Sequence, residues 1–475
     1  MRLTIIGGGG FRVPLVYQAL LDPPGCAPLV DEVALYDADP GRVAAIGPVL
    51  AGLAERARPA GTAGRAGTAG DRPAAPQVLA CPTLDEALAG AQYVFCAVRV
   101  GGLRGRVVDE RVALDLGLLG QETTGAGGVC YGLRGVPVMD SIATRIAARA
   151  PDAWTINFTN PAGLVTEAMG AVLGDRVIGI CDSPAGLLRR VAWLLGVRLE
   201  RVWFDYAGLN HLGWLRAAYV DGRDRLPGLL ADPVALGRIE EGRLFGPDWL
   251  GELGMIPNEY LYYYYYTREV IAAIRAGGQT RGELLAGQQG AFYARLAAGG
   301  RAGIEPERAA AEWARVRAER DATYLAEAPR GSAADGEPAG GGYEQLAVAV
   351  MAALAGRAPS TLVLNVRNRS ALSAVDHAAV VEVPCLVDGN GAHPVAVGEL
   401  PAGAGALVAA VKAAERATIE AARSGSRSAA VRALALHPLV DSVDTARLLL
   451  NGYAAGHPEL AHLAPTTKGH HTAHR

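Results

Sequence analysis

Short apolar runs alternate with amphipathic stretches along the first 200 residues. The runs end at glycine, asparagine or charged residues, which is typical of buried strands in a parallel sheet. The stretches between them repeat apolar residues at helical spacing, first over residues 13–21 and again from Pro40. The strand-like runs occupy residues 3–6, 33–39, 93–98, 153–158 and 177–180. This alternation predicts an α/β fold that opens with a Rossmann-like domain and its parallel sheet.

The remainder of the chain mixes longer helical patterns with a few strand-like runs. We expect helices at residues 307–325, 343–355, 404–422, 428–436 and 441–453, and strands at 361–366 and 378–383. Such a mixture predicts a C-terminal α+β domain. Two segments rich in Gly, Ala and Pro, at 56–76 and 328–342, have no apolar period and indicate surface loops.

The composition narrows the class of protein. With 475 residues, of which 50% are hydrophobic and 20% charged, the chain is long enough for a substantial core and two domains. A net charge of −3 argues against a nucleic-acid partner. The six cysteines lack the pairing and density of a disulfide scaffold, which favours a reducing, cytoplasmic setting. We expect no membrane partner, because no apolar run reaches spanning length and no signal peptide is evident.

Four consecutive glycines, at residues 7–10, lie between the first predicted strand and the first predicted helix. Such a turn favours a phosphate, because free backbone N–H groups and the helix dipole both attract an anion. The GxGxxG spacing is not strictly met, so the turn alone is a weak signal. Asp37, at the end of the second predicted strand, is the candidate ligand of a ribose, with Asp39 in reserve. Both aspartates have an alternative role as caps of the helix that begins near Pro40.

Polar side chains follow several further predicted strands. Arg99 precedes two glycines, a polar GQETTG loop begins at Gly120, and Asn160 follows the strand at 153–158. The carboxyl ends of parallel strands meet at one edge of a sheet, where open α/β proteins bind their ligands. We therefore expect these groups to share one site.

A thiol and an imidazole continue this series. Cys181 and Asp182 end the strand at 177–180, and His211 lies in a short turn after a strand-like run at 201–207. A thiolate and an imidazole from neighbouring strand ends could share one divalent metal ion and leave its other positions open for substrate. Taken singly, a cysteine at a strand end is most often a small buried hydrophobe. The polar neighbours favour the metal site.

Several motifs together resemble the glycoside hydrolases of family 4. They are RVGG after strand 93–98, GQETTG, NFTNP, ICDSP, GLNHLGW, IPNEYLYYYYY, QTRGELL, LVLNVRN, VVEVP, VGELP and ALHPLVDS, and they span nearly the whole chain. Gly10 stands where a serine is common in the family, and Ala126 where a proline is common. The resemblance implies an NAD- and Mn²⁺-dependent 6-phosphoglucosidase, outside the two-carboxylate glycosidase scheme. It also implies a homodimer or homotetramer and a phosphorylated glucoside as the small-molecule partner.

The resemblance further implies the order of the chemistry. NAD⁺ takes a hydride from carbon 3 of the sugar, a base removes the proton on carbon 2, the glycosidic bond breaks by elimination, water adds, and the hydride returns. The implied base is Tyr260 of PNEYL, the implied acid is Asp182, and the implied metal ligands are Cys181 and His211. The implied cofactor-binding residues are Gly7, Gly8, Gly9, Gly10, Phe11, Arg12 and Asp37, and the implied substrate-binding residues are Arg99, Asn160 and Arg281.

Some assignments keep alternatives. Arg99 has three candidate partners, namely the phosphate, the sugar and the metal-bound hydroxyls, and Arg281 has the alternative of a solvated helix charge. Asp182 resembles the α-specific members, whereas PNEYL with QTRGELL resembles the β-specific ones, and we favour a 6-phospho-β-glucosidase. An NAD-dependent hydroxy-acid dehydrogenase would lack a reason for the Cys181 and His211 pair, and a non-catalytic NAD sensor would be free to lose Tyr260.

The expected organisation has three parts. An NAD-binding Rossmann-like domain occupies residues 1–200, an α+β domain at 201–464 provides the substrate wall and the subunit interface, and residues 465–475 form a disordered tail.

Overall fold

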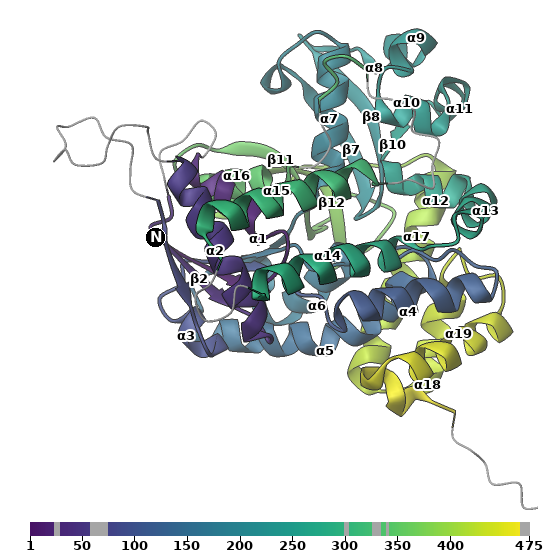
Figure 1. Cartoon of the computed structure of the whole chain (residues 1–475). Coiled ribbons are helices and arrows are strands. Elements are labelled where there is room, and N and C mark those ends of the chain that lie inside the picture. Colours follow the sequence, from purple (N-terminus) through teal and green to yellow (C-terminus); the bar gives the residue numbers. More distant parts are fainter. Residues whose placement is uncertain (23–28, 58–74, 299–303, 325–333, 339–341, 466–475) are drawn as a thin grey trace, which may run out of the picture.

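The computed structural model describes residues 1–22, 29–57, 75–298, 304–324, 334–338 and 342–465. One mixed β-sheet runs through this part of the chain, with helices packed around it (Figure 1). Most of the two loops predicted at 56–76 and 328–342, and of the tail predicted at 465–475, lies outside the described residues. Among the described helices, none has the length and apolar character needed to cross a bilayer.

Six parallel strands form one half of the sheet, in the order β3-β2-β1-β4-β5-β6. This is the strand order of a doubly wound dinucleotide-binding fold, so the predicted fold class is confirmed. The strands are β1 (Arg2–Ile6), β2 (Glu32–Tyr36), β3 (Gln77–Ala80), β4 (Tyr93–Cys96), β5 (Trp154–Asn157) and β6 (Val177–Gly179).

Antiparallel strands extend the sheet beyond β6. They are β7 (Trp203–Leu209), β8 (Leu212–Val220), β9 (Arg223–Asp224), β10 (Ile256–Pro257), β11 (Ser360–Arg367), β12 (Val380–Asp388) and β13 (Gly391–Pro394). The junction is a pairing of Asn365 on β11 with Gly179 on β6. The sheet is therefore continuous where the sequence suggested a division near residue 200, and that division stays a prediction.

The helices of the parallel half follow the strands they connect. They are α1 (Val13–Leu21), α2 (Pro40–Ala57), α3 (Leu84–Leu88), α4 (Gly102–Asp115), α5 (Ala126–Arg149), α6 (Ala162–Leu173) and α7 (Asp182–Leu194). Each of α1 to α4, α6 and α7 begins within a few residues of a strand end, which places its amino terminus at the carboxyl edge of the sheet. That edge is where an anion meets free backbone N–H groups.

The second half adds a small helical lobe beside β7 and β8, at the top of Figure 1. Its helices are α8 (Leu226–Leu230), α9 (Pro233–Leu236), α10 (Glu240–Phe245) and α11 (Pro247–Leu253). Next come α12 (Tyr262–Tyr265), α13 (Thr267–Gly277), α14 (Arg281–Ala297), α15 (Pro306–Ala322), α16 (Tyr343–Leu354), α17 (Ala402–Ser424), α18 (Arg427–Leu436) and α19 (Val443–Gly456). Helix α15 packs on α2, and α17 and α19 pack on α5 and α4, so the second half closes around the first.

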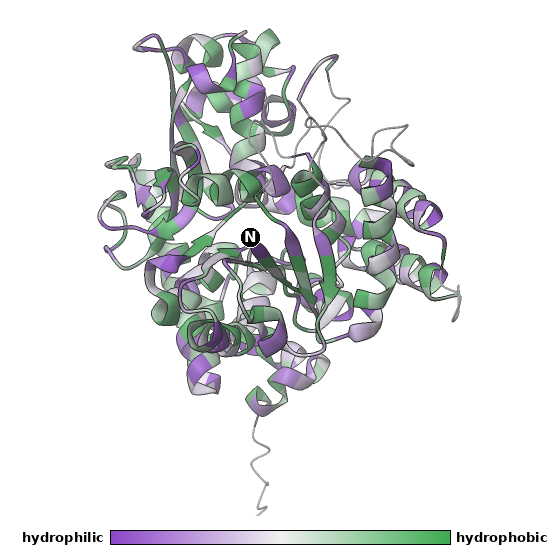
Figure 2. Ribbon diagram, turned by 90° about the vertical axis from the view of Figure 1, so that its left-hand side faces the viewer, coloured by the Kyte–Doolittle hydropathy of each residue, from purple (hydrophilic) through white to green (hydrophobic). Residues whose placement is uncertain are grey.

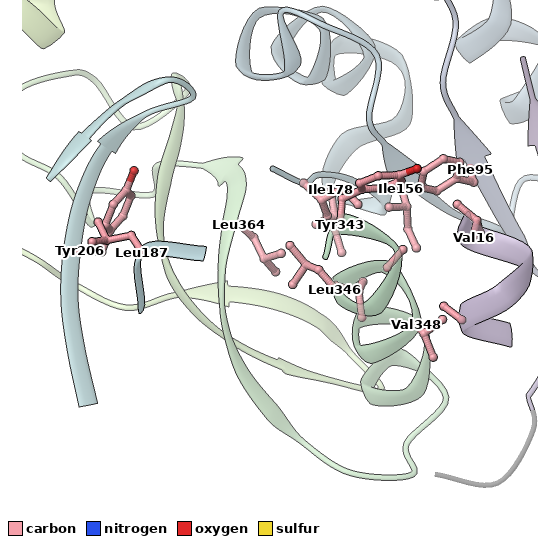
Figure 3. Packing of buried hydrophobic residues seen from close by; sticks show 14 of the residues in the cluster. Val16, Phe95, Ile156, Ile178, Leu187, Tyr206, Tyr343, Leu346, Val348 and Leu364 are labelled. Carbon is pink, nitrogen blue, oxygen red and sulfur yellow. The ribbon is translucent and has the colours of Figure 1, made fainter. Parts of the chain in front are cut away.

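The strand alternation divides the core between the two faces of the sheet. On β4, Tyr93 and Phe95 belong to one buried cluster, whereas Val94 and Cys96 belong to another. Tyr343 and Leu346 of α16 pack on the face of the sheet that carries Phe95, as Figure 3 shows. Many helices carry both hydrophobic and hydrophilic residues, as the colours in Figure 2 show, whereas α1 and α16 are mostly apolar. Packing of both faces is what fixes the strand ends that carry the candidate site.

Candidate active site

A cleft of about 1360 Å³ opens along the carboxyl edge of the parallel strands. It is lined by residues from both halves of the chain, including α14 and the end of α15. The predicted site residues that line it are Gly7, Gly10, Phe11, Arg12, Asp37, Arg99, Asn160, Cys181, Asp182, His211, Tyr260 and Arg281. Gly8 and Gly9 do not line this cleft. The structure thus brings together residues that lie more than 250 positions apart, whereas their roles stay predictions.

The glycine turn is shaped by close backbone contacts. Gly7 has a φ of +87°, and a Cβ atom there would lie 2.4 Å from the carbonyl oxygen of Ala97. A Cβ atom on Gly9 would lie 2.5 Å from Cβ of Arg42. The Gly10 N–H donates to the Gly7 carbonyl oxygen at 2.9 Å, which closes the turn just before α1. Only glycine fits at residues 7 and 9, and the resulting turn is the cradle a pyrophosphate needs.

The two candidate ribose ligands separate in the structure. Asp37 lines the cleft, and its Oδ2 accepts the Gly9 N–H at 3.0 Å. Asp39 instead caps α2, because its Oδ1 accepts the N–H groups of Gly41 and Arg42. The capping alternative therefore holds for Asp39, and Asp37 remains the candidate for a ribose.

Phe11 and Arg12 have different environments although they are adjacent. Phe11 is 5% exposed and packs edge-on against Phe292 with ring centroids 5.2 Å apart. The guanidinium of Arg12 lies over the rings of Phe158 and Tyr343, at 5.5 and 5.1 Å from their centroids. Phe11 thus mainly anchors the turn, whereas Arg12 presents its charge to the cleft.

Arg99 is held by a carboxylate that the sequence analysis did not single out. Glu122, in the GQETTG loop, accepts hydrogen bonds from Arg99 and, at 2.7 Å, from Arg106 of α4. Burial alone would raise the pKa of Glu122, but the two guanidinium groups outweigh it and lower that pKa to about 2. Arg106 also donates to Glu110 at 2.7 Å. This buried network fixes the direction of Arg99, and the polar GQETTG loop was its signal in the sequence.

Cys181 and His211 both line the cleft, but their strand ends are not neighbours as predicted, because β12 and β11 lie between β7 and β6 in the sheet. Cys181 caps α7 and is 5% exposed, and His211 occupies the tight turn between β7 and β8 with a φ of +62°. Nδ1 of His211 lies 3.0 Å from Thr123 Oγ1, which leaves Nε2 for another partner. Burial lowers the pKa of His211 to about 4, so the imidazole is neutral at pH 7. A neutral imidazole and a thiol that line one cleft are donors that suit a divalent metal ion.

A second His and Cys cluster lies deeper in the structure. Asp109, Cys130 and His457 place their ligand atoms within 4.8 Å of one another. Nη1 of Arg134 lies 2.6 Å from Asp109, 3.1 Å from the Cys130 sulfur and 3.2 Å from His457 Nε2. A guanidinium already supplies the positive charge at this centre, so the cluster is a buried ion pair that ties the chain end to α4 and α5.

Tyr260 lies directly against His211. Their rings stack with centroids 3.5 Å apart and planes 3° from parallel. Burial raises the pKa of Tyr260, and the neighbouring Glu259 raises it further, so the phenol is neutral in this structure. Tyr262 and Tyr263 are also buried.

Glu259 and Asp182 place two further carboxyl groups on the cleft. Oε1 of Glu259 accepts the Ser183 hydroxyl at 2.6 Å, whereas its buried Oε2 has no hydrogen-bond partner among the described residues. Burial raises the pKa of Glu259 to about 7. Asp182 lies in the first turn of α7, where the helix dipole favours a carboxylate. Glu259 was missed from the sequence because nothing in PNEYL marks it apart from the adjacent tyrosine.

Arg281 begins α14 and reaches the cleft, but much of its hydrogen bonding is internal. It donates to the backbone oxygens of Thr323 and Arg320, each at 2.9 Å. Arg281 is therefore not the freely solvated helix charge that was its alternative. Its contribution to phosphate binding stays a prediction.

Two family models match most of this chain. Residues 2–197 match the sequence model of family 4 glycosyl hydrolases, and residues 206–440 match the model of the C-terminal domain of that family. The chain is 32% identical to a probable 6-phospho-beta-glucosidase of Bacillus subtilis over 384 residues, which cover 79% of this chain and 81% of the relative.

Solved structures of similar chains contain NAD and manganese. The 6-phospho-beta glucosidase of Thermotoga maritima, solved with manganese, NAD⁺ and glucose-6-phosphate, has a TM-score of 0.77 and 27% identity, with 97% of this chain and 99% of that chain covered. A 6-phospho-alpha-glucosidase from gut microorganisms, solved with NAD and Mn²⁺, has a TM-score of 0.74 and 26% identity, with 96% and 97% covered.

Proposed function

Because this chain belongs to family 4 of the glycosyl hydrolases, we propose that it is a 6-phosphoglucosidase that uses NAD⁺ and a divalent metal ion, with Mn²⁺ as the expected ion. The observation that carries the proposal is the shared cleft, which joins the glycine turn to Cys181, His211 and Tyr260. The similar structures solved with NAD and manganese support both cofactors.

The residues of the cleft suit both groups. The turn at residues 7–10 and Asp37 would hold NAD⁺. Glycines lack side chains, so a pyrophosphate can approach the backbone of the turn closely. Cys181 and the neutral imidazole of His211 would hold the metal ion. When bound, NAD⁺ supplies a reversible hydride acceptor for carbon 3, and the metal ion supplies a Lewis acid for the adjacent oxygens.

The side chains of the chain itself would carry the proton transfers. Tyr260 would remove the proton on carbon 2 of the sugar, and Asp182 would give a proton to the oxygen of the leaving group. Arg99, fixed by Glu122, and Asn160 would orient the sugar hydroxyls, because both side chains line the cleft at strand ends. Arg281 would contribute to the site for the sugar phosphate.

We further propose that the preferred anomer is β. The PNEYL and QTRGELL segments support this preference, as does the name of the Bacillus subtilis relative. The alternative is the α anomer, because relatives named 6-phospho-alpha-glucosidase match the chain as well.

The test is an assay of p-nitrophenyl 6-phospho-β-glucoside and its α anomer, with NAD⁺ and Mn²⁺ present. The matched control is p-nitrophenyl β-glucoside without the phosphate. We expect the phosphorylated β compound to react fastest and the control to react very slowly. Faster release from the α anomer would reverse the anomeric assignment, and no release from either phosphorylated compound would refute the proposed function.

A further inference from the structure

Arg12 presents a positive charge to the cleft. In the described part of the chain its guanidinium has no hydrogen-bond acceptor and no carboxylate in salt-bridge contact. It is held instead by the rings of Phe158 and Tyr343, which stack on each other with centroids 4.1 Å apart. Arg presents five N–H groups around a planar edge, and contact through its face leaves that edge free for an anion.

A second cation lines the same cleft from α15, the helix whose Trp313 donates to the Phe11 carbonyl oxygen at 2.9 Å. Arg320, near the carboxyl end of α15, also lines the cleft, and its side chain is 16% exposed. Nη1 of Arg320 lies 3.4 Å from Oδ1 of Asp321, which is a long ionic contact. The charge on Arg12 is the largest cause that lowers the pKa of Arg320, followed by burial and by Arg281, and the resulting pKa is about 9. Two guanidinium groups that line one cleft, neither with a close carboxylate partner among the described residues, suit an anionic ligand.

Arg281 supports the backbone at the carboxyl end of α15. It donates to the backbone oxygen of Arg320 itself, and to that of Thr323. Arg281 therefore fixes the backbone from which Arg320 reaches the cleft, and its own donors are partly used. Unlike Arg281, neither Arg12 nor Arg320 has a side-chain hydrogen bond to a backbone oxygen among the described residues.

We propose that Arg12 and Arg320 together form an anion subsite that binds a phosphoryl group, and that this is the phosphoryl group of the substrate. The inference rests on the proposed function, and it moves Arg12 from the cofactor site to the sugar site. Asp182, Tyr260 and Tyr324 are among the charged or titratable groups that act most strongly on Arg12. Asp182 and Tyr260 are the proposed acid and base, so Arg12 is assigned to the sugar end of the cleft. Asp37 and Arg42 line the end proposed for the ribose.

A phosphoryl group can come from the sugar or from the pyrophosphate of NAD⁺, so both affinities are measured. Glucose 6-phosphate is titrated into protein loaded with NAD⁺ and Mn²⁺, and NAD⁺ is titrated separately without sugar. The variants are Arg12→Gln, Arg320→Gln and Arg12→Lys, which keeps the charge and loses the planar fork. The matched control is Arg315→Gln, on the same helix as Arg320, whose side chain is 49% exposed and pairs with Glu312 and Glu319.

We expect each glutamine variant to raise the Kd of glucose 6-phosphate by about 10-fold or more, the typical effect of losing a charge-assisted hydrogen bond. Arg12→Lys should recover part of this loss, and Arg315→Gln should match the wild type. The Kd of NAD⁺ should stay within about twofold, since the subsite is assigned to the sugar. Should Arg12→Gln fail to fold, Arg320→Gln and Arg12→Lys carry the same comparison.

Two results would overturn the inference. A loss of NAD⁺ affinity with unchanged glucose 6-phosphate affinity would assign the pair to the pyrophosphate, and unchanged affinity for both would remove the anion subsite. The proposed function fails separately, if the wild type binds glucose as tightly as glucose 6-phosphate. The affinities of the wild type for glucose and for glucose 6-phosphate decide this point without any variant.

Discussion

The imidazole ring of His211 lies flat against the phenol ring of Tyr260, with the ring centroids 3.5 Å apart. One residue comes from the turn between β7 and β8, and the other from the short helix at Glu259–Leu261. The candidate metal ligand and the candidate base are thus held as a unit. Chemistry at either residue should therefore be sensitive to a change in the other.

The first prediction concerns removal of the two bound groups. The hydride leaves and returns within one turnover, so NAD⁺ should be required and not consumed. A chelator should abolish release of p-nitrophenol, and added Mn²⁺ should restore it. The measurement is the rate after dialysis against chelator and after removal of NAD⁺, with each group then added back alone and together. Full activity without both groups would contradict the mechanism.

The second prediction concerns the metal ligands. Cys181→Ser and His211→Ala should each weaken Mn²⁺ binding by about 10-fold or more. Calorimetric titration with Mn²⁺ measures the affinity, and circular dichroism checks the fold. Cys81→Ser and His393→Ala are matched controls away from the cleft and should bind Mn²⁺ as the wild type does. Wild-type metal affinity in either cleft variant would make that residue a packing residue.

Much of the fold follows from local sequence pattern. Helix α1 was predicted with both of its ends, and the strand at 93–98 was predicted with two residues too many. These elements have a clear apolar period and are bounded by glycine or polar residues, so local chemistry decides them. The continuity of the sheet past β6 was not predictable in this way. It depends on Asn365 meeting Gly179, a pairing across 186 positions that no local period records.

Some site residues could likewise be predicted from the local sequence, and others could not. Residues at strand ends, such as Cys181 and Asn160, were predicted because parallel strands bring their ends to one edge. The polar GQETTG loop marked the neighbourhood of Glu122 but not the glutamate itself, and nothing in the local sequence marked Arg320. Glu122 matters through Arg106 on α4, and Arg320 through Arg12 at the other end of the chain.

The third prediction concerns the glycine turn. Gly7→Ala places a methyl group 2.4 Å from the Ala97 carbonyl oxygen at a φ of +87°. The variant should therefore lose about 1–3 kcal/mol of unfolding free energy and most of its NAD⁺ affinity. Gly290→Ala is the control, since a Cβ there meets nothing within 4 Å on the exposed face of α14. Urea unfolding and NAD⁺ titration measure both quantities, and equal behaviour of the two variants would contradict the steric argument.

The fourth prediction concerns pH and Glu122. Its pKa falls from the ordinary value of 4.5 to about 2 in the folded protein, because Arg106 and Arg99 outweigh the effect of burial. A lowered folded-state pKa means that this contribution to stability is present above about pH 4.5 and is lost as the pH falls toward 2. The contribution is on the order of 3 kcal/mol at neutral pH. The unfolding free energy of wild type minus that of Glu122→Gln should therefore shrink from pH 6 to pH 3, and a constant difference would contradict it.

The fifth prediction concerns Tyr260 and the order of steps. Tyr260→Phe keeps the ring that stacks on His211 and removes only the hydroxyl. Folding and NAD⁺ affinity should barely change, whereas kcat should fall by about 10²–10⁴-fold, as for loss of a positioned acid or base. Tyr266→Phe is the matched control, because its hydroxyl donates to the Phe245 carbonyl oxygen at 2.6 Å, away from the proposed chemistry.

The isotope at carbon 2 then distinguishes this role from a general loss of activity. With substrate deuterated at carbon 2, wild-type turnover should exchange the label with solvent, and Tyr260→Phe should suppress that exchange. Because hydride transfer comes first, the variant should still reduce bound NAD⁺, which absorbance at 340 nm follows directly. If the wild type instead retained the label in its hydrolysed product, the bond would be broken by displacement at the anomeric carbon. Tyr260 would then have no proton to remove, and the elimination chemistry assigned to this cleft would be wrong.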